Sequence, residues 1–524
     1  MGARLGARAL LLGAMPTHAL FAVRPGRVVT RVVDTLVIGA GFAGLGAALH
    51  LAEHGGSVAL CETLNYPGGC AGTFEKGGHA FEAGATLFSG FHDEGLFSRW
   101  IERHRLPVRF ELLDPIVELR TGDGHLLVSP DRATTVDRFC AQPGAPVAAL
   151  RAFFALQQRV ADTLWPIFDD AGRLPPLWWS GLGWHLGRSW RYPALLGLMN
   201  RSLGSVLASF GLDAYAPLVR YCDAVCQITI QTTAHDAEAL FALSAMDYLF
   251  RGTGHIRGGI GELAKAMVGA IERCGGEVTL TNRVRRLEHT PEGWRVQTRR
   301  GVYLARNVLA NLLPQAIAAL VPDRPAPAVV AAQSRALQGA WGAAMLYLVV
   351  RDHLQLPAAP HHYQCVADDA ARLQEGAHLF CSLAGRDEPG KARDGLRTAT
   401  VSTHLPLAVL RGLPDDSARA AYVQGVQDRM RATLRQRLPE IAGAIEVEFP
   451  GSPRTFERFT GRPGGSVGGI PRTRGWHNYR GLWPTTLYPR LWMIGDTTFP
   501  GQSTLAAALG GVRVARRLVS GSSR

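Results

Sequence analysis

Two short apolar runs flank a small apolar helix near the start of the chain. The runs occupy residues 34–39 and 57–61, and between them Leu45, Leu49 and Ala52 recur at helical spacing. Short apolar runs that end at glycine or at a polar residue are typical of buried parallel strands, which a helix must connect. The pattern therefore predicts a βαβ unit and an α/β fold.

Three glycines lie in the turn between the first strand and the helix. Gly39, Gly41 and Gly44 have the spacing G-x-G-x-x-G, and Glu62 follows the second strand. The first glycine makes a tight turn, the second lets the backbone approach a pyrophosphate, and the third lets the helix pack on the strand. The helix N-terminus then attracts phosphate, and the carboxylate accepts hydrogen bonds from a ribose. The segment predicts a dinucleotide site, which includes Ala43 in the same turn.

Two further segments bear on which dinucleotide binds, because the fingerprint alone does not separate NAD from FAD. One is a glycine pair shortly after the second strand, and the other is an apolar strand near the C-terminus that ends in Gly-Asp. A carboxylate at the C-terminal end of a strand can meet a ribityl hydroxyl, and the positive end of the next helix would point at the cofactor ring. The residues concerned are Gly68, Gly69, Gly495, Asp496, Gly501, Gln502 and Ser503.

The composition fits a large globular enzyme. Of 524 residues, 47% are hydrophobic and 19% charged, which allows a core shared by two or three lobes. The net charge of +13 comes almost wholly from arginine, and no basic run alternates with aromatic residues. We therefore expect no nucleic-acid partner. The eight cysteines are scattered and lack zinc-binding spacing, which favours a reduced, intracellular protein without a metal site.

The first 33 residues contain no Asp or Glu and carry five arginines around an apolar run. This composition is typical of a targeting segment, and an over-long start would also explain it. We exclude residues 1–33 from the prediction of the fold. If they form a transit segment, the protein belongs in an organelle; otherwise we expect it at the cytoplasmic face of a membrane.

Several segments together resemble one known family. The run up to Gly84, residues 258–263, residues 308–314 and the Gly495-Asp496 segment are similar to the phytoene-desaturase-type FAD oxidoreductases, and within them most similar to carotenoid isomerases and carotenoid desaturases. The resemblance implies a Rossmann-type FAD-binding domain of the glutathione-reductase kind, with a mixed sheet and a helical substrate domain. It places the FAD domain at residues 34–100, 252–315 and 485–520, and the substrate domain at residues 101–251 and 316–484.

The resemblance also implies roles for single residues. The fingerprint glycines and Glu62 would hold the ADP half of FAD, Gly68 and Gly69 would line the pyrophosphate, and Asp496 would bind the ribityl chain. Residues 276–284 are expected to form one strand whose Val284 backbone contacts adenine. Many desaturases have Arg after the glycine pair, where this chain has Cys70, so a phosphate contact is in doubt and an isomerase-like assignment is favoured.

A segment rich in tryptophan and arginine suggests how a substrate enters. No acidic residue occurs from Ala171 to Leu212. Apolar aromatic residues beside arginine are typical of helices that lie at a lipid headgroup boundary. We predict a peripheral membrane contact at the mouth of a substrate tunnel, and an ordinary tryptophan-rich core or interface with a solvated arginine face is the alternative. The segment contains Trp178, Trp179, Trp184, Trp190, Tyr192, Arg173, Arg188, Arg191 and Arg201.

The predicted function is FAD-dependent isomerisation or desaturation of a carotenoid or similar polyene, which an apolar tunnel and a flavin can perform without a catalytic triad. A polyene saturase, an amine-oxidase-like enzyme with a smaller substrate, and a non-catalytic flavoprotein that binds lipid or a partner remain alternatives. Arg257 and Glu262 are the candidate catalytic residues. The sequence has no second G-x-G-x-x-G, so the electron acceptor is open. Structural roles are expected for His235, His255, His361 and His362.

Overall fold

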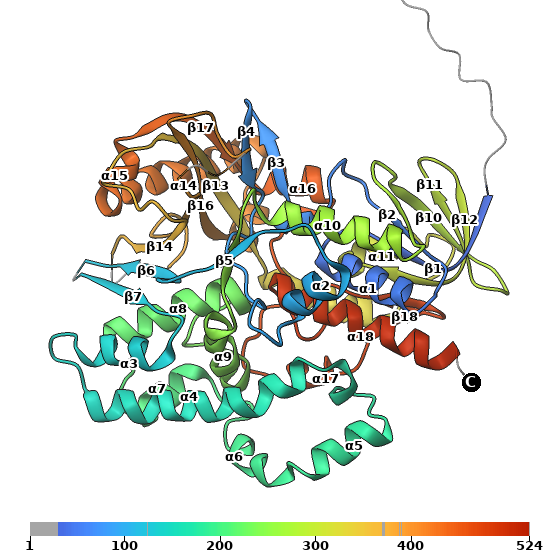
Figure 1. The fold of residues 1–524 in the computed structure, drawn as a ribbon, viewed down its shortest axis with the longest axis horizontal. Helices are drawn as coiled ribbons and strands as arrows, with labels where there is room; N and C mark the ends of the chain where they lie inside the picture. The colour runs from blue at the N-terminus through green and yellow to red at the C-terminus, as the bar shows by residue number, and fades with distance from the viewer. Residues whose placement is uncertain (1–29, 123, 369–372, 387, 389, 523–524) are drawn as a thin grey trace, which may run out of the picture.

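The computed structural model describes residues 30–122, 124–368, 373–386, 388 and 390–522, so most of the N-terminal segment discussed above lies outside the described residues. Two large sheets and a group of helices make up the molecule (Figure 1). An eight-stranded sheet lies at the right of the view, a seven-stranded sheet at the upper left, and most of the helices that connect them lie below. The predicted α/β fold is confirmed.

The eight-stranded sheet has a parallel centre. Its order is β10-β11-β12-β1-β2-β9, with β19 also paired to β12 and β18 paired to β19. β1 pairs in parallel with both β2 and β12, as a βαβ unit requires. The strands are β1 (Thr30–Ile38), β2 (Val58–Cys61), β9 (Glu277–Thr279), β10 (Val284–His289), β11 (Trp294–Thr298), β12 (Val302–Ala310), β18 (Thr486–Tyr488) and β19 (Leu491–Met493).

Two strand boundaries differ from the prediction. β1 begins at Thr30 and not at Asp34, because its first residues pair with β12 from Val302 onward. The single strand expected over residues 276–284 is two strands, β9 and β10. Thr281 between them has a φ of 53°, a left-handed conformation that interrupts an extended strand.

Helices cover both faces of this sheet. Successive residues of β1 point to opposite faces, so Val37 packs with α1, α10 and α18 while Leu36 packs with Ile317 and Val330 on the other side. The helices are α1 (Phe42–Glu53), α10 (Ile260–Arg273), α18 (Thr504–Ser522), α11 (Pro314–Ala319) and α12 (Ala328–Ala336). α11 and α12 therefore belong with the nucleotide-binding sheet, and the domain boundary predicted after residue 315 is too early.

The seven-stranded sheet has the order β17-β13-β16-β15-β14-β6-β7. Its two longest strands, β13 and β16, pair antiparallel along their whole length, and α14 (Asp416–Arg437) packs on one face. The strands are β6 (Val117–Arg120), β7 (His125–Val128), β13 (Trp341–Arg351), β14 (His361–Val366), β15 (His378–Leu383), β16 (Leu396–Pro406) and β17 (Ile445–Gly451).

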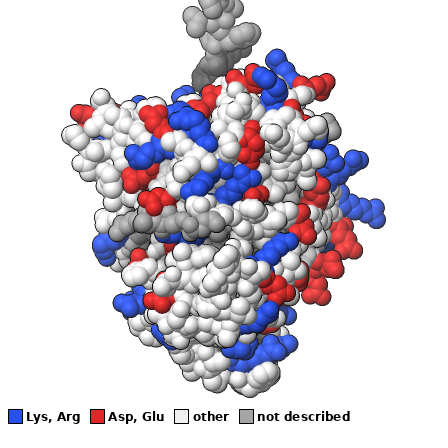
Figure 2. Space-filling view, turned by 90° about the vertical axis from the view of Figure 1, so that its left-hand side faces the viewer, with Lys and Arg blue, Asp and Glu red and all other residues white. Residues whose placement is uncertain are grey.

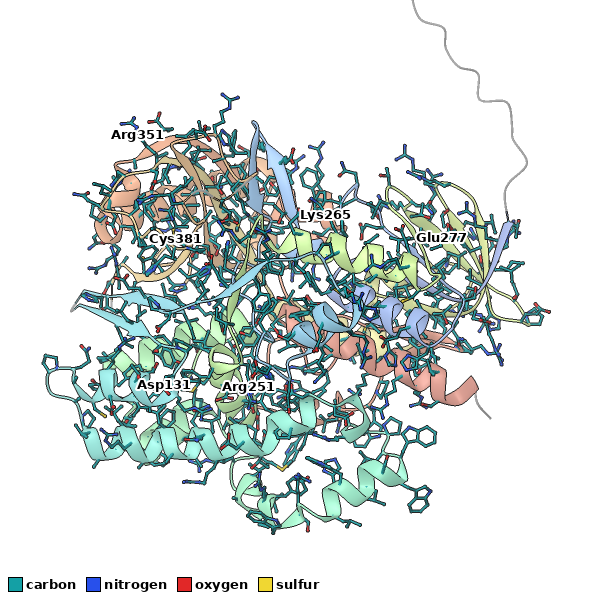
Figure 3. The ribbon with its side chains drawn as sticks, viewed as in Figure 1. Asp131, Arg251, Lys265, Glu277, Arg351 and Cys381 are labelled. Atoms are coloured by element: carbon teal, nitrogen blue, oxygen red, sulfur yellow. The ribbon has the colours of Figure 1, made fainter. Side chains whose placement is uncertain are left out.

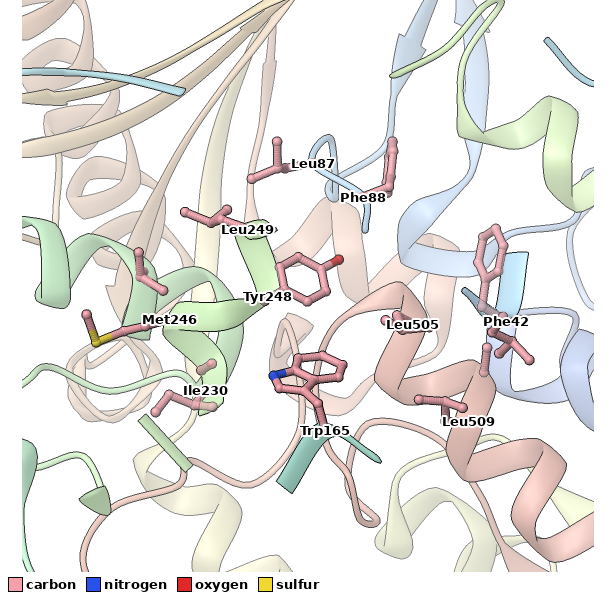
Figure 4. Close-up of a cluster of buried hydrophobic side chains, with 14 of the residues drawn as sticks. Phe42, Leu87, Phe88, Trp165, Ile230, Met246, Tyr248, Leu249, Leu505 and Leu509 are labelled. Atoms are coloured by element: carbon pink, nitrogen blue, oxygen red, sulfur yellow. The ribbon is translucent and has the colours of Figure 1, made fainter. Parts of the chain in front are cut away.

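The remaining helices form the lower part of the molecule. They are α3 (Arg132–Cys140), α4 (Val147–Phe168), α5 (Trp179–Leu186), α6 (Pro193–Leu196), α7 (Leu203–Ser209), α8 (Ala216–Ile230) and α9 (Ala239–Met246). Figure 4 shows where this part meets the nucleotide-binding part: Trp165 and Tyr248 face Leu505 and Leu509 of α18 across a buried apolar cluster. None of the helices within the described residues is both long and apolar enough to cross a membrane.

Smaller elements connect these parts. β3 and β4 form a hairpin that follows the glycine pair, and β5 pairs with β8 between the two large sheets. The elements are β3 (Thr73–Lys76), β4 (His79–Glu82), β5 (Phe110–Leu112), β8 (Gly254–Ile256), α2 (Leu96–His104), α13 (Leu407–Gly412), α15 (Pro439–Ala442), α16 (Pro453–Thr460) and α17 (His477–Arg480). All eight cysteines are free thiols.

Charge is mixed on the face that Figure 2 shows. Basic and acidic side chains are interspersed there, and broad uncharged areas separate them. On this face the basic side chains do not form the continuous stripe that is typical of nucleic-acid binding surfaces.

One carboxylate joins α1 to α2. Glu53 lies 3.2 Å from His50 Nδ1, 3.0 Å from His104 Nε2 and 3.4 Å from Arg103 Nη1. Burial alone would raise the pKa of Glu53, but the hydrogen bond and charge of His50 and the charge of Arg103 lower it to about 2. Because these groups stabilise the ionised form, the folded state gains stability from Glu53 at neutral pH.

We expect Glu53→Gln to lower the free energy of unfolding by about 1 to 3 kcal/mol at pH 7. Glu53 contributes its full stabilisation above the pKa of about 4.5 that it has in the unfolded chain. The difference in unfolding free energy between variant and parent should therefore narrow as the pH falls toward 2. Urea unfolding at several pH values measures it. Glu272→Gln, an exposed position on α10, is the control. A difference that stays constant with pH would contradict the ionic role of Glu53.

Candidate dinucleotide site

The turn after β1 brings helix and strand unusually close. A Cβ atom at Gly44 would lie 1.9 Å from the carbonyl oxygen of Gly39, so only glycine allows α1 to take this position. Gly39 itself has a φ of 94°, which L-residues rarely adopt. The N-terminus of α1 therefore faces the carboxyl ends of the parallel strands, where ligands of open α/β sheets bind.

Glu62 is held at the end of β2 by the backbone. Its carboxylate accepts hydrogen bonds from the amides of Ala40, at 2.6 Å, and Leu64, at 2.8 Å. Burial raises the pKa of Glu62, and these hydrogen bonds oppose the rise. Each carboxylate oxygen keeps a free lone pair, so the group can still accept hydrogen bonds from a ribose.

A cavity of about 710 Å³ begins at this turn and extends between the two sheets. It is within the size range of cavities that bury cofactors or small ligands. Ten of the predicted cofactor residues line it: Gly39, Gly41, Ala43, Glu62, Gly68, Gly69, Val284, Asp496, Gln502 and Ser503. Gly44, Gly495 and Gly501 are not among the lining residues, and their close neighbours are protein atoms.

An arginine from a distant loop enters this cavity. Arg462 lies 2.9 Å from Asp496, and both residues line the cavity. Burial lowers the pKa of Arg462, but the charges of Asp496 and Cys70 and the hydrogen bond to Asp496 together outweigh it, and the net shift of the pKa is upward. Burial raises the pKa of Cys70, and the charge of the same guanidinium opposes this rise.

Sequence reasoning missed Asn311, which stands at the centre of the glycine turn. A Cβ atom at Gly41 would lie 2.7 Å from Asn311 Nδ2, and one at Gly495 would lie 2.5 Å from Asn311 Oδ1. Two glycines far apart in the sequence therefore leave room for one side chain. The available signal was its position: Asn311 is the polar residue that directly follows the buried strand β12.

Several buried polar groups at the cavity have no hydrogen-bond partner among the described residues. They include Gln502 Oε1 and Thr504 Oγ1 on the cavity wall, and the two polar side-chain atoms of Gln231, Nε2 and Oε1, nearby. Buried polar groups are nearly always paired in proteins, so these atoms indicate a polar ligand in this part of the cavity. A dinucleotide, with its ring carbonyls, hydroxyls and phosphates, fits them and the glycine turn.

The other end of the cavity is more apolar. Ile228, Ala343, Met345 and Phe380 line it, and His404 is a titratable residue there. Burial lowers the pKa of His404 to about 4, so its imidazole is neutral at physiological pH. This end can therefore accept an apolar molecule without leaving a buried charge unpaired.

Two predicted catalytic residues are in the wrong place. Neither Arg257 nor Glu262 lines the cavity, and Glu262 forms an exposed ion pair with Lys265 on α10 at 2.7 Å. Figure 3 labels Lys265 on that helix. The first turn of α10 packs against β3, where the Gly261 amide donates to Thr73 Oγ1. Glu262, which follows Gly258 and Gly259, lies beside this contact and points to solvent.

The four histidines have partners outside the cavity. His235 lies beside Asp236 at the surface, His361 contacts Glu118, and His255 contacts Glu388. His362 contacts Ser382 in the second sheet. These contacts agree with structural roles.

The tryptophan segment is exposed. Trp179 of α5 is 86% exposed and Trp190 is 72% exposed, so these two side chains do not belong to a tryptophan-rich core, whereas the alternative of an interface stays open. Arg173 and Arg188 lie over the ring of Trp184 at 4.5 and 4.3 Å, and α5 and α6 form the lower edge of the molecule (Figure 1).

The fold and the site define a Rossmann-type dinucleotide-binding protein. A family model described as "NAD(P)-binding Rossmann-like domain" matches residues 37–103. Prolycopene isomerase of Arabidopsis thaliana is 24% identical over 93% of this chain and 82% of its own length. Phytoene desaturase (lycopene-forming) of a Paracoccus strain is 25% identical over 48% of this chain and 49% of its own. A crystal structure of an oxidoreductase from Methanosarcina mazei superposes with a TM-score of 0.63 at 15% identity, over 92% of this chain and all of that one.

The predicted resemblance to the phytoene-desaturase-type FAD/NAD(P)-binding oxidoreductases is confirmed by these relatives. Most of its length is shared with the isomerase, whereas the desaturase shares about half.

We expect Gly44→Ala to destabilise the protein by about 3 kcal/mol, because the added methyl group forces α1 away from β1. Thermal and urea unfolding measure the loss. Gly183→Ala on α5 is a matched control, since a Cβ there meets no atom within 4 Å, and it should be neutral or slightly stabilising. Equal stability of the two variants would contradict the close packing of the turn.

Proposed function

We propose that this protein is an FAD-dependent isomerase of carbon–carbon double bonds in a carotenoid-like polyene. The observation that carries the proposal is the single cavity, which joins a glycine-turn end suited to a dinucleotide with an apolar end suited to a hydrocarbon. The isomerase relative, which aligns along nearly the whole chain, supports the assignment of the reaction.

The chain's own residues would hold FAD along this cavity. Glu62 would accept hydrogen bonds from the adenosine ribose, the amides at the start of α1 would hold the pyrophosphate, and Asp496 would accept hydrogen bonds from the ribityl chain. Arg462 fixes the orientation of Asp496 through their ion pair. When bound, a flavin supplies hydride or electron exchange with a conjugated carbon.

A polyene offers no group for hydrogen bonding, so shape and burial must select it. The apolar end of the cavity provides both, through Ile228, Met345 and Phe380. The protein's part in the reaction is to place one double bond against the cofactor ring and to exclude water. Isomerisation leaves the mass of the substrate unchanged and needs no external electron acceptor in a complete cycle.

Desaturation is the second candidate, because the Paracoccus relative is a desaturase by name. It would remove two hydrogens from the substrate and pass the electrons to an acceptor. The alignment with that relative covers about half of this chain, and Cys70 departs from the arginine of many desaturases. Both observations favour isomerisation.

We expect purified protein with reduced flavin to convert a cis polyene into an isomer of the same mass. Incubation in liposomes with a panel of cis and all-trans polyenes, followed by chromatography with mass detection, measures the product. Loss of two hydrogens would replace isomerisation by desaturation, and gain of two would replace it by saturation. If no polyene changes while the bound flavin is reduced by an amine, a small-substrate oxidase would replace this proposal.

The exposed tryptophans support peripheral membrane binding, which would give a hydrocarbon direct access from the bilayer. Trp179 and Trp190 project from a segment that carries arginines, and Arg191 lies 4.9 Å from the ring of Trp190. Aromatic rings at the acyl boundary and guanidinium groups among the phosphates would hold this edge on a membrane.

We expect the double variant Trp179→Ser/Trp190→Ser to lose at least about half of its flotation with anionic liposomes, since each indole contributes buried apolar area. Leu354→Ser, which removes an exposed apolar side chain next to the second sheet, is the control and should float like the parent. Equal flotation of the double variant and the parent would contradict the membrane contact.

A further inference from the structure

A second, much smaller cavity lies behind the wall of the large one. Its volume is about 20 Å³, enough for one water molecule. It is bounded by polar side chains that are almost completely buried, which is unusual next to a chamber for a hydrocarbon. The polar residues on its wall are Glu82, Thr86, His255, His362, Ser382, Lys391, Thr398 and Thr400.

Thr86 is shared by the two cavities, and a chain of hydrogen bonds leads away from it. Ser382 Oγ donates to Thr86 Oγ1 at 2.6 Å. His362 Nδ1 lies 2.7 Å from Ser382 Oγ. Because the serine hydrogen is already directed at Thr86, His362 Nδ1 must be the donor in the second hydrogen bond.

The direction of this chain fixes the tautomer of His362. Burial, assisted by the charge of His255, lowers the pKa of His362 to about 3, so the imidazole is neutral and carries one hydrogen. With that hydrogen on Nδ1, Nε2 presents a lone pair. Nε2 is buried and has no partner among the described residues. A water molecule in the small cavity would donate to it.

Charged groups surround the same small cavity. Lys391 donates to Glu82, and His255 Nε2 lies 3.0 Å from both carboxylate oxygens of Glu388. Thr73 also donates to Glu82, at 2.9 Å. The Lys391 ammonium is therefore a buried source of a proton next to the position of the water.

We propose that Thr86, Ser382, His362 and one buried water form a relay that delivers a proton from the Lys391 cluster to the large cavity. The inference rests on the proposed function for what receives the proton: a polar atom of the cofactor ring, or the polyene itself. Every hydrogen bond of the relay points toward Thr86. Since Thr86 Oγ1 accepts from Ser382, its own hydroxyl hydrogen stays available to a ligand in the large cavity, which Thr86 lines.

The transfer balances without any further reactant. Thr86 gives its hydroxyl proton to the acceptor and takes the proton of Ser382, which takes the proton from His362 Nδ1. His362 Nε2 takes a proton from the water, and the water takes one from Lys391, which becomes a neutral amine. When the acceptor gives up a proton at the end of a cycle, the reverse transfers restore the ammonium, so no electron is gained or lost.

The tautomer provides a test that does not depend on activity. In protein labelled with ¹⁵N-histidine, NMR correlation spectra should show a neutral His362 with its hydrogen on Nδ1. His362→Gln identifies the signal among the 17 histidines by its disappearance. A hydrogen on Nε2 would reverse the direction of the chain and overturn the proposal, whether or not the protein binds flavin.

Variants of Thr86 test delivery to the large cavity. Thr86→Val should keep bound flavin and the unfolding midpoint but slow turnover about 100-fold and abolish the solvent deuterium isotope effect. Thr86→Ser should restore both, and Ser382→Ala should resemble Thr86→Val. Thr229→Val is the control, because that threonine lines the same cavity but donates to Val225 O within its own helix.

Parent-like turnover of Thr86→Val with its flavin retained would overturn the relay. If instead the parent binds no flavin and changes no polyene, the proposed function fails, and the tautomer measurement decides separately whether the chain is directed toward Thr86.

Discussion

The close approach of α1 to β1 is the contact on which the rest of the structure depends. It exists because Gly44 has no side chain where the Gly39 carbonyl oxygen lies. That packing points the N-terminus of a buried helix at the carboxyl ends of β1 and β2, and it leaves room for Glu62 to be held by backbone amides. Polar recognition at one end of the cavity thus rests on a steric constraint at a single position.

The second sheet provides an environment of a different kind. Its strands present Ala343, Met345 and Phe380 to the cavity, and behind them lies the polar cluster around His362. The glycine-turn end of the cavity, its more apolar end and the buried hydrogen-bonded chain therefore lie close together.

Sequence reasoning succeeded where function depends on neighbours along the chain. The glycine turn and Glu62 carry their geometry in their spacing, so their approximate positions in the fold followed from the βαβ pattern. The position of Asp496 was indicated by the apolar strand that ends in Gly495-Asp496. The position of Asn311 did not follow from spacing, because Asn311 meets Gly41 and Gly495 only after distant strands have assembled. Glu262 was a candidate catalytic residue because it follows Gly258 and Gly259. Its position on α10 directs the side chain to solvent, where it forms an ion pair with Lys265. The prediction placed α11 and α12 with the substrate domain, but they pack on the eight-stranded sheet. The sequence of an apolar helix does not indicate which of two sheets the helix will cover.

The proposed function requires that the cavity holds FAD. The most direct measurement is the identity and amount of the nucleotide that denaturation releases from the purified protein, by mass spectrometry and absorbance. The account predicts FAD at about one molecule per chain, in keeping with the single glycine-turn cavity. Release of a nicotinamide dinucleotide in its place, or failure to take up FAD even when the folded protein is supplied with it, would contradict the account.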